Sequence, residues 1–424
     1  MNQAYFTFCC SGTGLSVSGI GGDCARAAVK GTSEQELSVY KKFCSYPQYL
    51  KCPGSDGSLN SSLFLSLEPF AKLVFSSVGT TPGRCFLAHS VYAMPDKQTH
   101  REGNYFSHLL YPLPESWSVR TALEMWGSPF WVTEDSETIS PELPPIQDEQ
   151  KIPFGIINEK SFVEFLRSSP DRQKRFLFVL KSLMTLKPNN KIVLIGFPED
   201  MAFCLWGATR CLPSSMWKNL TFSTHEKPML SFSYVAVNFP VPEKMSSQDE
   251  IIFHDLVQRQ DILLYSDNPQ IPSTQFPPNH FADDILKNCL NGKYSALTEF
   301  YKSIPPNMKD SGTMLNLFWL FLYRHEFITI RDIELAITVP ILKESAIKIL
   351  MDNSHFTLDE QLKIYPFLDE QKQEAILNRL ISEKSIKQIR DNAQYSQLLV
   401  SALSVPEEPK DPEKDRSFLH KLFR

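Results

Sequence analysis

The chain has 424 residues, of which 42% are hydrophobic and 12% aromatic, so it can bury several cores and is long enough for two or three domains. Charged residues make up 21% and the formal net charge is −5, so no overall basic field attracts nucleic acid. The longest apolar run, residues 314–323, is about half of a membrane span. Because no positive region precedes an apolar stretch at the N-terminus, we expect no secretory signal. We expect a cytoplasmic protein without a membrane partner, and the net charge disfavours a nucleic-acid partner.

Residues 1–132 predict a β-rich N-terminal module of α+β type. Its strand-length apolar runs, for example residues 72–78 and 86–94, are separated by Gly, Ser and Pro. From residue 133 to 151 the composition becomes acidic, rich in Pro and poor in core residues. This change predicts a linker between the first module and the next.

Residues 152–280 predict an α/β middle module. The run KIVLIGF at 191–197 is apolar without alternation, as in a strand that is covered on both faces. A helix is expected over 199–211, and another strand near 220–223. Because strand and helix patterns alternate here, a layered α/β arrangement is the simplest assignment.

Residues 281–404 predict an all-helical C-terminal domain, with 314–323 as a buried helix. Pairs of short helices are typical of helical-repeat arrays, although the sequence alone gives no fixed period. Residues 405–424 form a charged tail that ends in a short amphipathic helix. Its apolar face consists of Phe418, Leu419, Leu422 and Phe423. This helix either folds back onto its own domain or docks into a groove of a partner protein.

The glycine-rich stretch 12–22 does not predict a nucleotide site. Gly14 and Gly19 have the spacing of a phosphate-binding loop, but Ile20 and Gly21 follow where Lys is required. The dinucleotide fingerprint also fails, because Val17 stands where its third glycine belongs. We therefore predict no nucleotide cofactor.

The chain has nine cysteines, and none of them forms a C-x-x-C motif. The thiols are therefore expected to be reduced and mostly buried. No pattern of ligands in the chain matches a known metal site, and no metal is predicted.

Polar residues are densest between Gly83 and Trp131. The cluster contains Arg84, His89, Asp96, His100, Arg101, Asn104, Tyr105 and His108. One interpretation is a rigid structural or partner-binding surface. The alternative is a Cys/His hydrolase, in which a nucleophilic thiol is activated by an imidazole. Its candidate residues are Cys9, Cys10, Cys85, His89 and His108. Cys85 and His89 lie four positions apart, about 13 Å in an extended strand, so these two do not touch directly.

Two parts of the sequence resemble the bacterial GTPase-associated protein one family. YFTFCCSGTGLSVSGIGG, GRCFLAHSVYAMPDKQTHREGNYFSHLL and ALEMWGSPFW are similar to its N-terminal domain, and CLPSSMWKNLTFSTH is similar to a turn of its middle domain. The resemblance implies an accessory protein of multi-component prokaryotic antiviral-defence systems, encoded near a GTPase that it scaffolds or regulates. It places Arg84, His89, Asp96, Arg101, Gly103, Asn104, Tyr105, Phe106 and His108 at positions of the family motif. It does not extend to the C-terminal helices.

We therefore expect a non-enzymatic adaptor or regulatory scaffold that acts through protein–protein contacts. Its expected partner-binding residues are Arg84, His89, Asp96, Arg101, Asn104, Tyr105 and His108, with Phe418, Leu419, Leu422 and Phe423 of the tail. The expected partners are proteins encoded nearby, a GTPase among them. The Cys/His hydrolase is the alternative, and recognition of phage nucleic acid is a weaker third hypothesis that the net charge disfavours.

Overall fold

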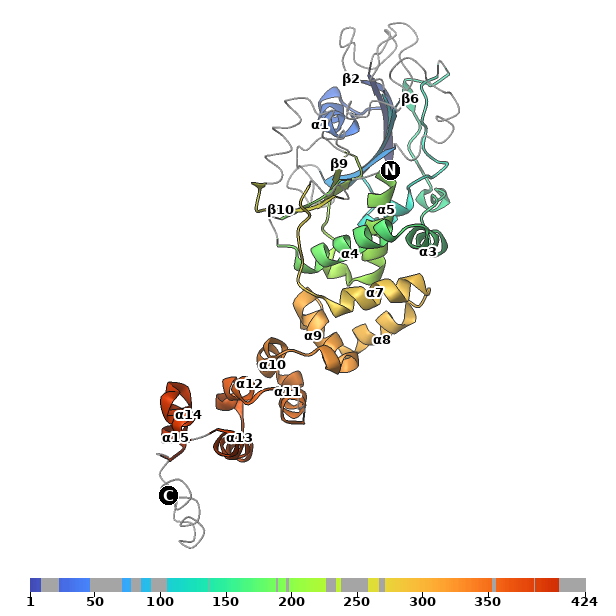
Figure 1. Ribbon diagram of the computed structural model, residues 1–424. Helices are drawn as coiled ribbons and strands as arrows, with labels where there is room; N and C mark the ends of the chain where they lie inside the picture. The colour runs from blue at the N-terminus through green and yellow to red at the C-terminus, as the bar shows by residue number, and fades with distance from the viewer. Residues whose placement is uncertain are drawn as a thin grey trace. The chain divides into compact units, whose positions relative to one another are not determined.

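A computed structural model gives the arrangement of the chain (Figure 1). It describes residues 1–8, 23–45, 71–77, 85–92, 105–136, 138–187, 190–195, 198–225, 234–237, 258–266, 271–352, 356–384 and 386–403. The chain divides into two compact units, Met1–Trp319 and Leu320–Arg424.

The described strands of the first unit form one mixed sheet. In chain order they are β1 (Asn2–Phe8), β2 (Asp23–Val29), β3 (Lys72–Ser77), β4 (Cys85–Tyr92), β5 (Tyr105–Tyr111), β6 (Glu142–Leu143), β7 (Lys191–Ile195), β8 (Phe222–Ser223), β9 (Tyr234–Val237) and β10 (Ile262–Ser266). Their order across the sheet is β10-β7-β9-β8-β3-β4-β5-β1-β2-β6. The strands from β10 to β8 are mutually parallel, and those from β3 to β2 are mutually antiparallel.

The two halves of the sheet meet where β8 pairs with β3 in antiparallel register. The strands of residues 1–132 and those of 152–280 therefore share one sheet, whereas the sequence predicted two separate modules. The broader prediction of an α+β chain with helices in its C-terminal half is confirmed. The run at β7 is a buried strand between two parallel neighbours, as its continuous apolar pattern indicated.

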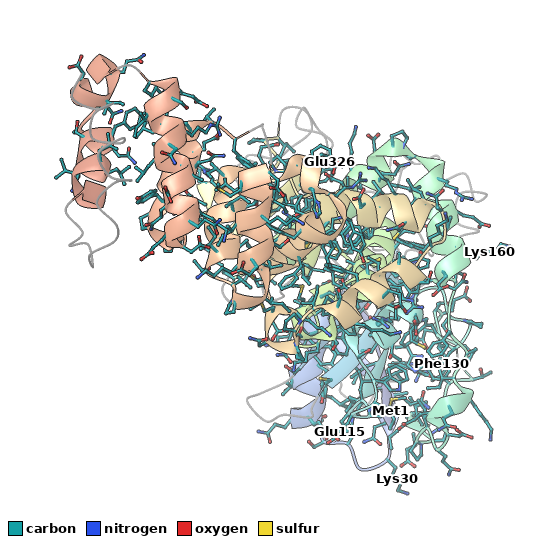
Figure 2. The ribbon with its side chains drawn as sticks, turned by 90° about the horizontal axis from the view of Figure 1, so that it is seen from below. Met1, Lys30, Glu115, Phe130, Lys160 and Glu326 are labelled. Atoms are coloured by element: carbon teal, nitrogen blue, oxygen red, sulfur yellow. The ribbon has the colours of Figure 1, made fainter. Side chains whose placement is uncertain are left out.

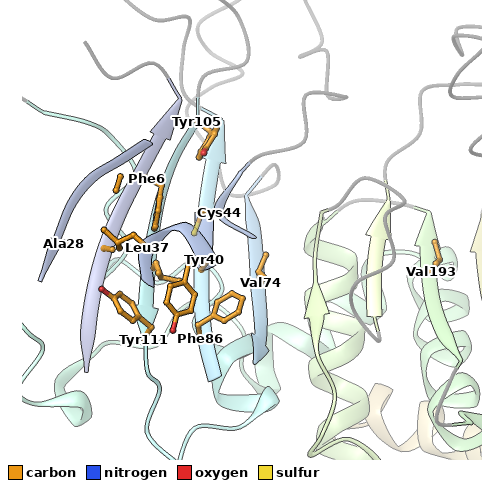
Figure 3. Packing of buried hydrophobic residues seen from close by; sticks show 14 of the residues in the cluster. Phe6, Ala28, Leu37, Tyr40, Cys44, Val74, Phe86, Tyr105, Tyr111 and Val193 are labelled. Carbon is orange, nitrogen blue, oxygen red and sulfur yellow. The ribbon is translucent and has the colours of Figure 1, made fainter. Parts of the chain in front are cut away.

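The helix α1 (Glu34–Cys44) covers one face of the antiparallel strands (Figure 3). Ser33 caps its first turn, because its side chain accepts a backbone N–H there. Leu37, Tyr40 and Cys44 point from the helix into the sheet. The Tyr40 ring packs edge-on against a phenylalanine of β4, with ring centroids 5.4 Å apart. This packing fixes the position of the C-terminal end of α1.

The opposite face of the antiparallel strands carries an aromatic layer. Side chains alternate between the two faces along a strand, so His89 and His108 point away from α1. They meet Phe130 and Trp131, which follow the short helix α2 (Val119–Glu124). The face that carries these histidines is thus an interior face.

The helices α3 (Glu159–Ser168), α4 (Pro170–Thr185) and α5 (Pro198–Cys211) pack together beside α2 (Figure 1). Phe165 of α3 stacks on Phe203 of α5 at a centroid distance of 4.7 Å. A Cβ at Gly207 would lie 2.1 Å from the ring of Phe162. The close contact of α3 and α5 therefore requires glycine at this position.

Residues 133–151, expected to be a linker, lie along the edge of the sheet. Within them β6 pairs with β2, and the N–H of Ile146 donates to the carbonyl of Met1. The buried Arg26 of β2 donates to Asp135 at 2.9 Å. Because backbone and side-chain contacts fix this segment, it serves as an edge of the first unit.

A second layer of helices completes the first unit. It contains α7 (His280–Leu290), α8 (Ser295–Ser303) and most of α9 (Gly312–Tyr323), which continues into the second unit. Trp319 of α9 donates its indole N–H to Asp284 of α7 at 2.9 Å. Most of the apolar run at 314–323 is buried as predicted, but Leu322 and Tyr323 at its end are 44% and 51% exposed.

The second unit consists of short helices that pack in pairs. They are α10 (Ile330–Ile337), α11 (Pro340–Asp352), α12 (Leu358–Lys363), α13 (Glu370–Glu383), α14 (Ile386–Asp391) and α15 (Ala393–Leu403). Contacts are concentrated between α10 and α11, α12 and α13, and α14 and α15. Thr329 and Thr357 begin the first two pairs with the same reciprocal capping box. This recurrence indicates an array of helical hairpins, which the sequence pattern suggested without a period.

The cysteines differ from expectation at one position. Cys44, Cys85, Cys204, Cys211 and Cys289 are not disulfide-bonded, as predicted. Cys24, in contrast, is disulfide-bonded, so the expectation that the thiols are reduced is wrong there.

Candidate functional site

The sequence-predicted residues divide into a described set and a set outside the described residues. The latter comprises Cys9, Cys10, Arg84, Asp96, His100, Arg101, Asn104, Phe418, Leu419, Leu422 and Phe423. The described set is Cys85, His89, Tyr105 and His108. Its members come from the neighbouring strands β4 and β5.

His89 and His108 stand directly opposite each other in the β4–β5 register. The His89 ring stacks on the indole of Trp131, with centroids 5.0 Å apart and planes at 7°. The His108 ring stacks on Phe130, labelled in Figure 2, at 5.2 Å and meets Trp131 edge-on at 5.3 Å. The two imidazoles thus form part of a continuous aromatic layer.

Hydrogen bonds define the protonation state of His108. Its Nδ1 accepts the backbone N–H of Val132 at 3.2 Å, so the ring proton lies on Nε2 and points to Oε1 of Gln3 at 3.1 Å. The amide of Gln3 donates in turn to the carbonyl of Pro144 at 2.8 Å. Burial, together with the nearby His89, lowers the pKa of His108 to about 3. The imidazole is therefore neutral at physiological pH.

The three described members of the predicted partner-binding surface are buried. His89, Tyr105 and His108 are 0%, 2% and 1% exposed. In this packing their side chains cannot touch a partner, because strands and aromatic rings cover them. His89 and His108 join the sheet to the segment around Trp131, whereas Tyr105 belongs to the hydrophobic cluster on the α1 face. The partner-binding roles of the residues outside the described ranges stay predictions.

Cys85 does not have the surroundings of an activated nucleophile. It lies on β4 on the same face as His89, four residues away, which is about 13 Å along an extended strand. Burial raises the pKa of its thiol, so the reactive thiolate is disfavoured. Cys85 therefore lacks the properties that the hydrolase alternative requires.

A second polar group, missed by the sequence analysis, lies on the other face of the same strands. Lys72, Ser90 and Ser107 form a row across β3, β4 and β5 and are all 0% exposed. Ser90 and Ser107 donate to the carbonyl of Cys44 at 2.9 and 2.6 Å. The Lys72 ammonium donates to the carbonyl of Ser45 at 2.8 Å.

These contacts place polar side chains at the C-terminal end of α1. The last carbonyls of a helix have no partner within the helix, and a cation there also offsets the negative end of the helix dipole. Two positions away on the same strand face, the neighbours of Ser90 and Ser107 include the apolar Ala88 and Leu109, and this break in an apolar face was the available signal. The arrangement explains why a lysine is stable in the interior.

The carboxyl end of β8 lies beside Lys72, because β8 pairs with β3 in antiparallel register. The N–H of Thr224 donates to the carbonyl of Leu73 at 3.0 Å, and Ser223, Thr224 and His225 are buried. Burial, and then the charge of Lys72, lowers the pKa of His225 to about 3. Parallel α/β sheets commonly bind ligands beyond the carboxyl ends of their strands, so this edge is the best-placed candidate site among the described residues.

The charges near the end of β7 do not favour an anionic ligand. The first turn of α5 contains Glu199 and the buried Asp200, where phosphate-binding helices offer free N–H groups. Asp200 forms ion pairs with Arg172 at 3.2 Å and with Arg175. The two cations on α4 are thus engaged by this carboxylate, and no step of a reaction follows from the arrangement.

The described residues contain no group of three or more His, Cys, Asp or Glu side chains that could hold a metal ion. Within the same residues, no helix combines the length and apolar character needed to cross a membrane. No protein-family model matches the chain. The sequence also matches no curated protein.

Proposed function

We propose that this chain is a non-enzymatic adaptor or regulatory scaffold in a prokaryotic, GTPase-associated antiviral-defence complex. The proposal assigns recognition to protein–protein contacts made by the helical second unit. The first unit, in which the polar side chains of the sheet are used in packing, serves as the rigid part to which this unit is attached.

The observation that carries the proposal is the distribution of exposed apolar side chains. Among the described residues, six of the nine large hydrophobic side chains that are exposed belong to the second unit. They are Leu322, Tyr323, Phe327, Ile341, Phe367 and Val400. Exposed apolar groups of this kind commonly mark protein interaction sites. Arrays of helical hairpins also provide extended binding surfaces.

Ile341 and Phe367 are the most suitable residues for a test. Ile341 follows the turn between α10 and α11, and Phe367 lies in the turn between α12 and α13. They are 60% and 55% exposed, so a charge at either position costs little folding energy. In the isolated chain, both side chains are exposed and can contact a partner protein.

The test is co-purification of the full chain with the proteins encoded by neighbouring genes, the GTPase first. We expect a stable complex, and we expect the double variant Ile341→Asp/Phe367→Asp to weaken it at least about tenfold, because two apolar contacts become charged. Phe154→Asp is the matched control, since Phe154 is 57% exposed on the first unit. The proposal is contradicted if no neighbouring product binds, or if the control variant weakens the complex as much as the double variant does.

A further inference from the structure

Two free thiols meet between the α/β layer and the second helical layer of the first unit. Cys211 is the last residue of α5, and Cys289 lies in the last turn of α7. Their Sγ atoms are 3.4 Å apart. Both residues are buried, with 1% and 0% exposure. The proposed adaptor function makes no use of this pair.

Contacts that do not involve sulfur hold the two helix ends in place. The hydroxyl of Tyr301 on α8 donates to the carbonyl of Cys211 at 2.6 Å. Arg167 of α3 donates twice to the carbonyl of Leu290 at the end of α7, at 2.6 and 3.1 Å. The proximity of the thiols is therefore fixed by the backbone on both sides.

We propose that Cys211 and Cys289 are a reversible oxidation site, whose disulfide ties α5 to α7 and locks the α7–α8 layer onto the α/β layer. A disulfide has an S–S length of about 2.05 Å, so the two sulfur atoms need to approach by only about 1.4 Å. Cys204 lies in the same helix, is equally buried and is not disulfide-bonded. It provides an internal comparison.

The reaction balances with a peroxide as oxidant. One thiolate attacks a peroxide oxygen, the O–O bond breaks, and a sulfenic acid forms as the first water leaves. The second thiol then displaces the sulfenic oxygen as a second water while the S–S bond forms. Two thiols lose two protons and two electrons in total, and hydrogen peroxide takes them up.

The surroundings of the pair make this oxidation slow in the closed structure. Hydrogen bonding to Cys289 and burial raise the pKa of Cys211, so the thiolate is scarce. Access by an oxidant therefore requires local opening of the α7–α8 layer. Once formed, the disulfide opposes that opening, so oxidation converts a non-covalent contact between α5 and α7 into a covalent one.

The experiment treats the reduced full chain with hydrogen peroxide over several hours and maps disulfides by mass spectrometry without reduction. We expect a peptide pair joined through Cys211 and Cys289 that dithiothreitol separates. The oxidised chain should melt on the order of 5–10 °C higher, because the cross-link closes a long loop. Cys211→Ser and Cys289→Ser should each abolish both effects, whereas Cys204→Ser should retain them.

The wild-type chain alone can overturn the proposal, even if a serine variant does not fold. If both thiols react with N-ethylmaleimide after the oxidised chain is unfolded, no disulfide has formed between them. A joined pair that leaves the melting temperature unchanged would refute the locking role. Because neither readout involves a partner protein, failure here is distinguishable from failure of the proposed adaptor function.

Discussion

Lowering the pH should destabilise the first unit through its buried neutral histidines. Burial lowers the pKa of His108 from its ordinary 6.5 to about 3, and the pKa of His225 falls equally far. In the unfolded chain both imidazoles take up protons near the ordinary value. The unfolded state therefore binds more protons between these two pH values, and stability is lost as the pH falls through this window.

The magnitude follows from the two pKa values. Between pH 7 and pH 5 each histidine that is neutral when folded costs about 2 kcal/mol of unfolding free energy. If the two groups act independently, His108 and His225 together remove about 4 kcal/mol. Typical total stabilities are about 5–15 kcal/mol, so the change is a large share of the whole.

The assay is urea unfolding followed by tryptophan fluorescence at pH 7, 6 and 5, because Trp131 lies against both His89 and His108. His108→Gln cannot be protonated and should reduce the loss between pH 7 and pH 5 by about 2 kcal/mol. His280→Gln, on a partly exposed residue of α7, is the matched control for replacing a histidine outside the aromatic layer. If His108→Gln loses as much stability as the wild type, the assignment of a buried neutral imidazole is refuted.

Two further substitutions test the polar group around Lys72 and the close packing of Gly155 against Trp126. Lys72→Met removes the positive charge that helps lower the pKa of His225, so an NMR titration should show that pKa rising, and an unchanged value would count against the proximity of the two groups. Gly155→Ala should destabilise by roughly 2–4 kcal/mol in urea unfolding, because its Cβ would lie 1.7 Å from the carbonyl oxygen of Trp126. At Gly31, φ is 87° and an added Cβ would meet nothing within 4 Å beyond its chain neighbours. Gly31→Ala should therefore cost only about 1–2 kcal/mol from backbone strain, and a loss equal to that of Gly155→Ala would contradict the packing argument.

The sequence predicted single helices and strands well where the pattern of apolar residues was clear. The continuous apolar run at 191–197 indicated a buried strand, and the structure has β7 at Lys191–Ile195. The helix expected at 199–211 corresponds to α5, Pro198–Cys211. Such patterns can be recognised from the sequence because the apolar residues that bury a strand or a helix face recur at a fixed spacing within that element.

The pairing of strands across the two blocks was not accessible in the same way. β3 and β8 are far apart in the sequence, and nothing in either sequence indicates which strand it pairs with. The composition of residues 133–151 indicated a linker. The segment contains few core residues because it lies at the edge of the sheet, where β6 pairs with β2 alone. A dense set of polar residues around His89 and His108 suggested a surface, yet Trp131 and Gln3 supply the partners that make burial favourable.

The pairing of β3 with β8 also limits how early the sheet can be completed while the chain is being synthesised. Leu73 donates to the side chain of Thr224, a contact between residues 151 positions apart. Until Thr224 has been synthesised, β3 lacks its neighbour on that side and presents unpaired backbone groups to other nascent chains. A fragment of residues 1–132 would never acquire β8, so β3 would stay unpaired on that side. We therefore expect this fragment to aggregate when it is expressed alone.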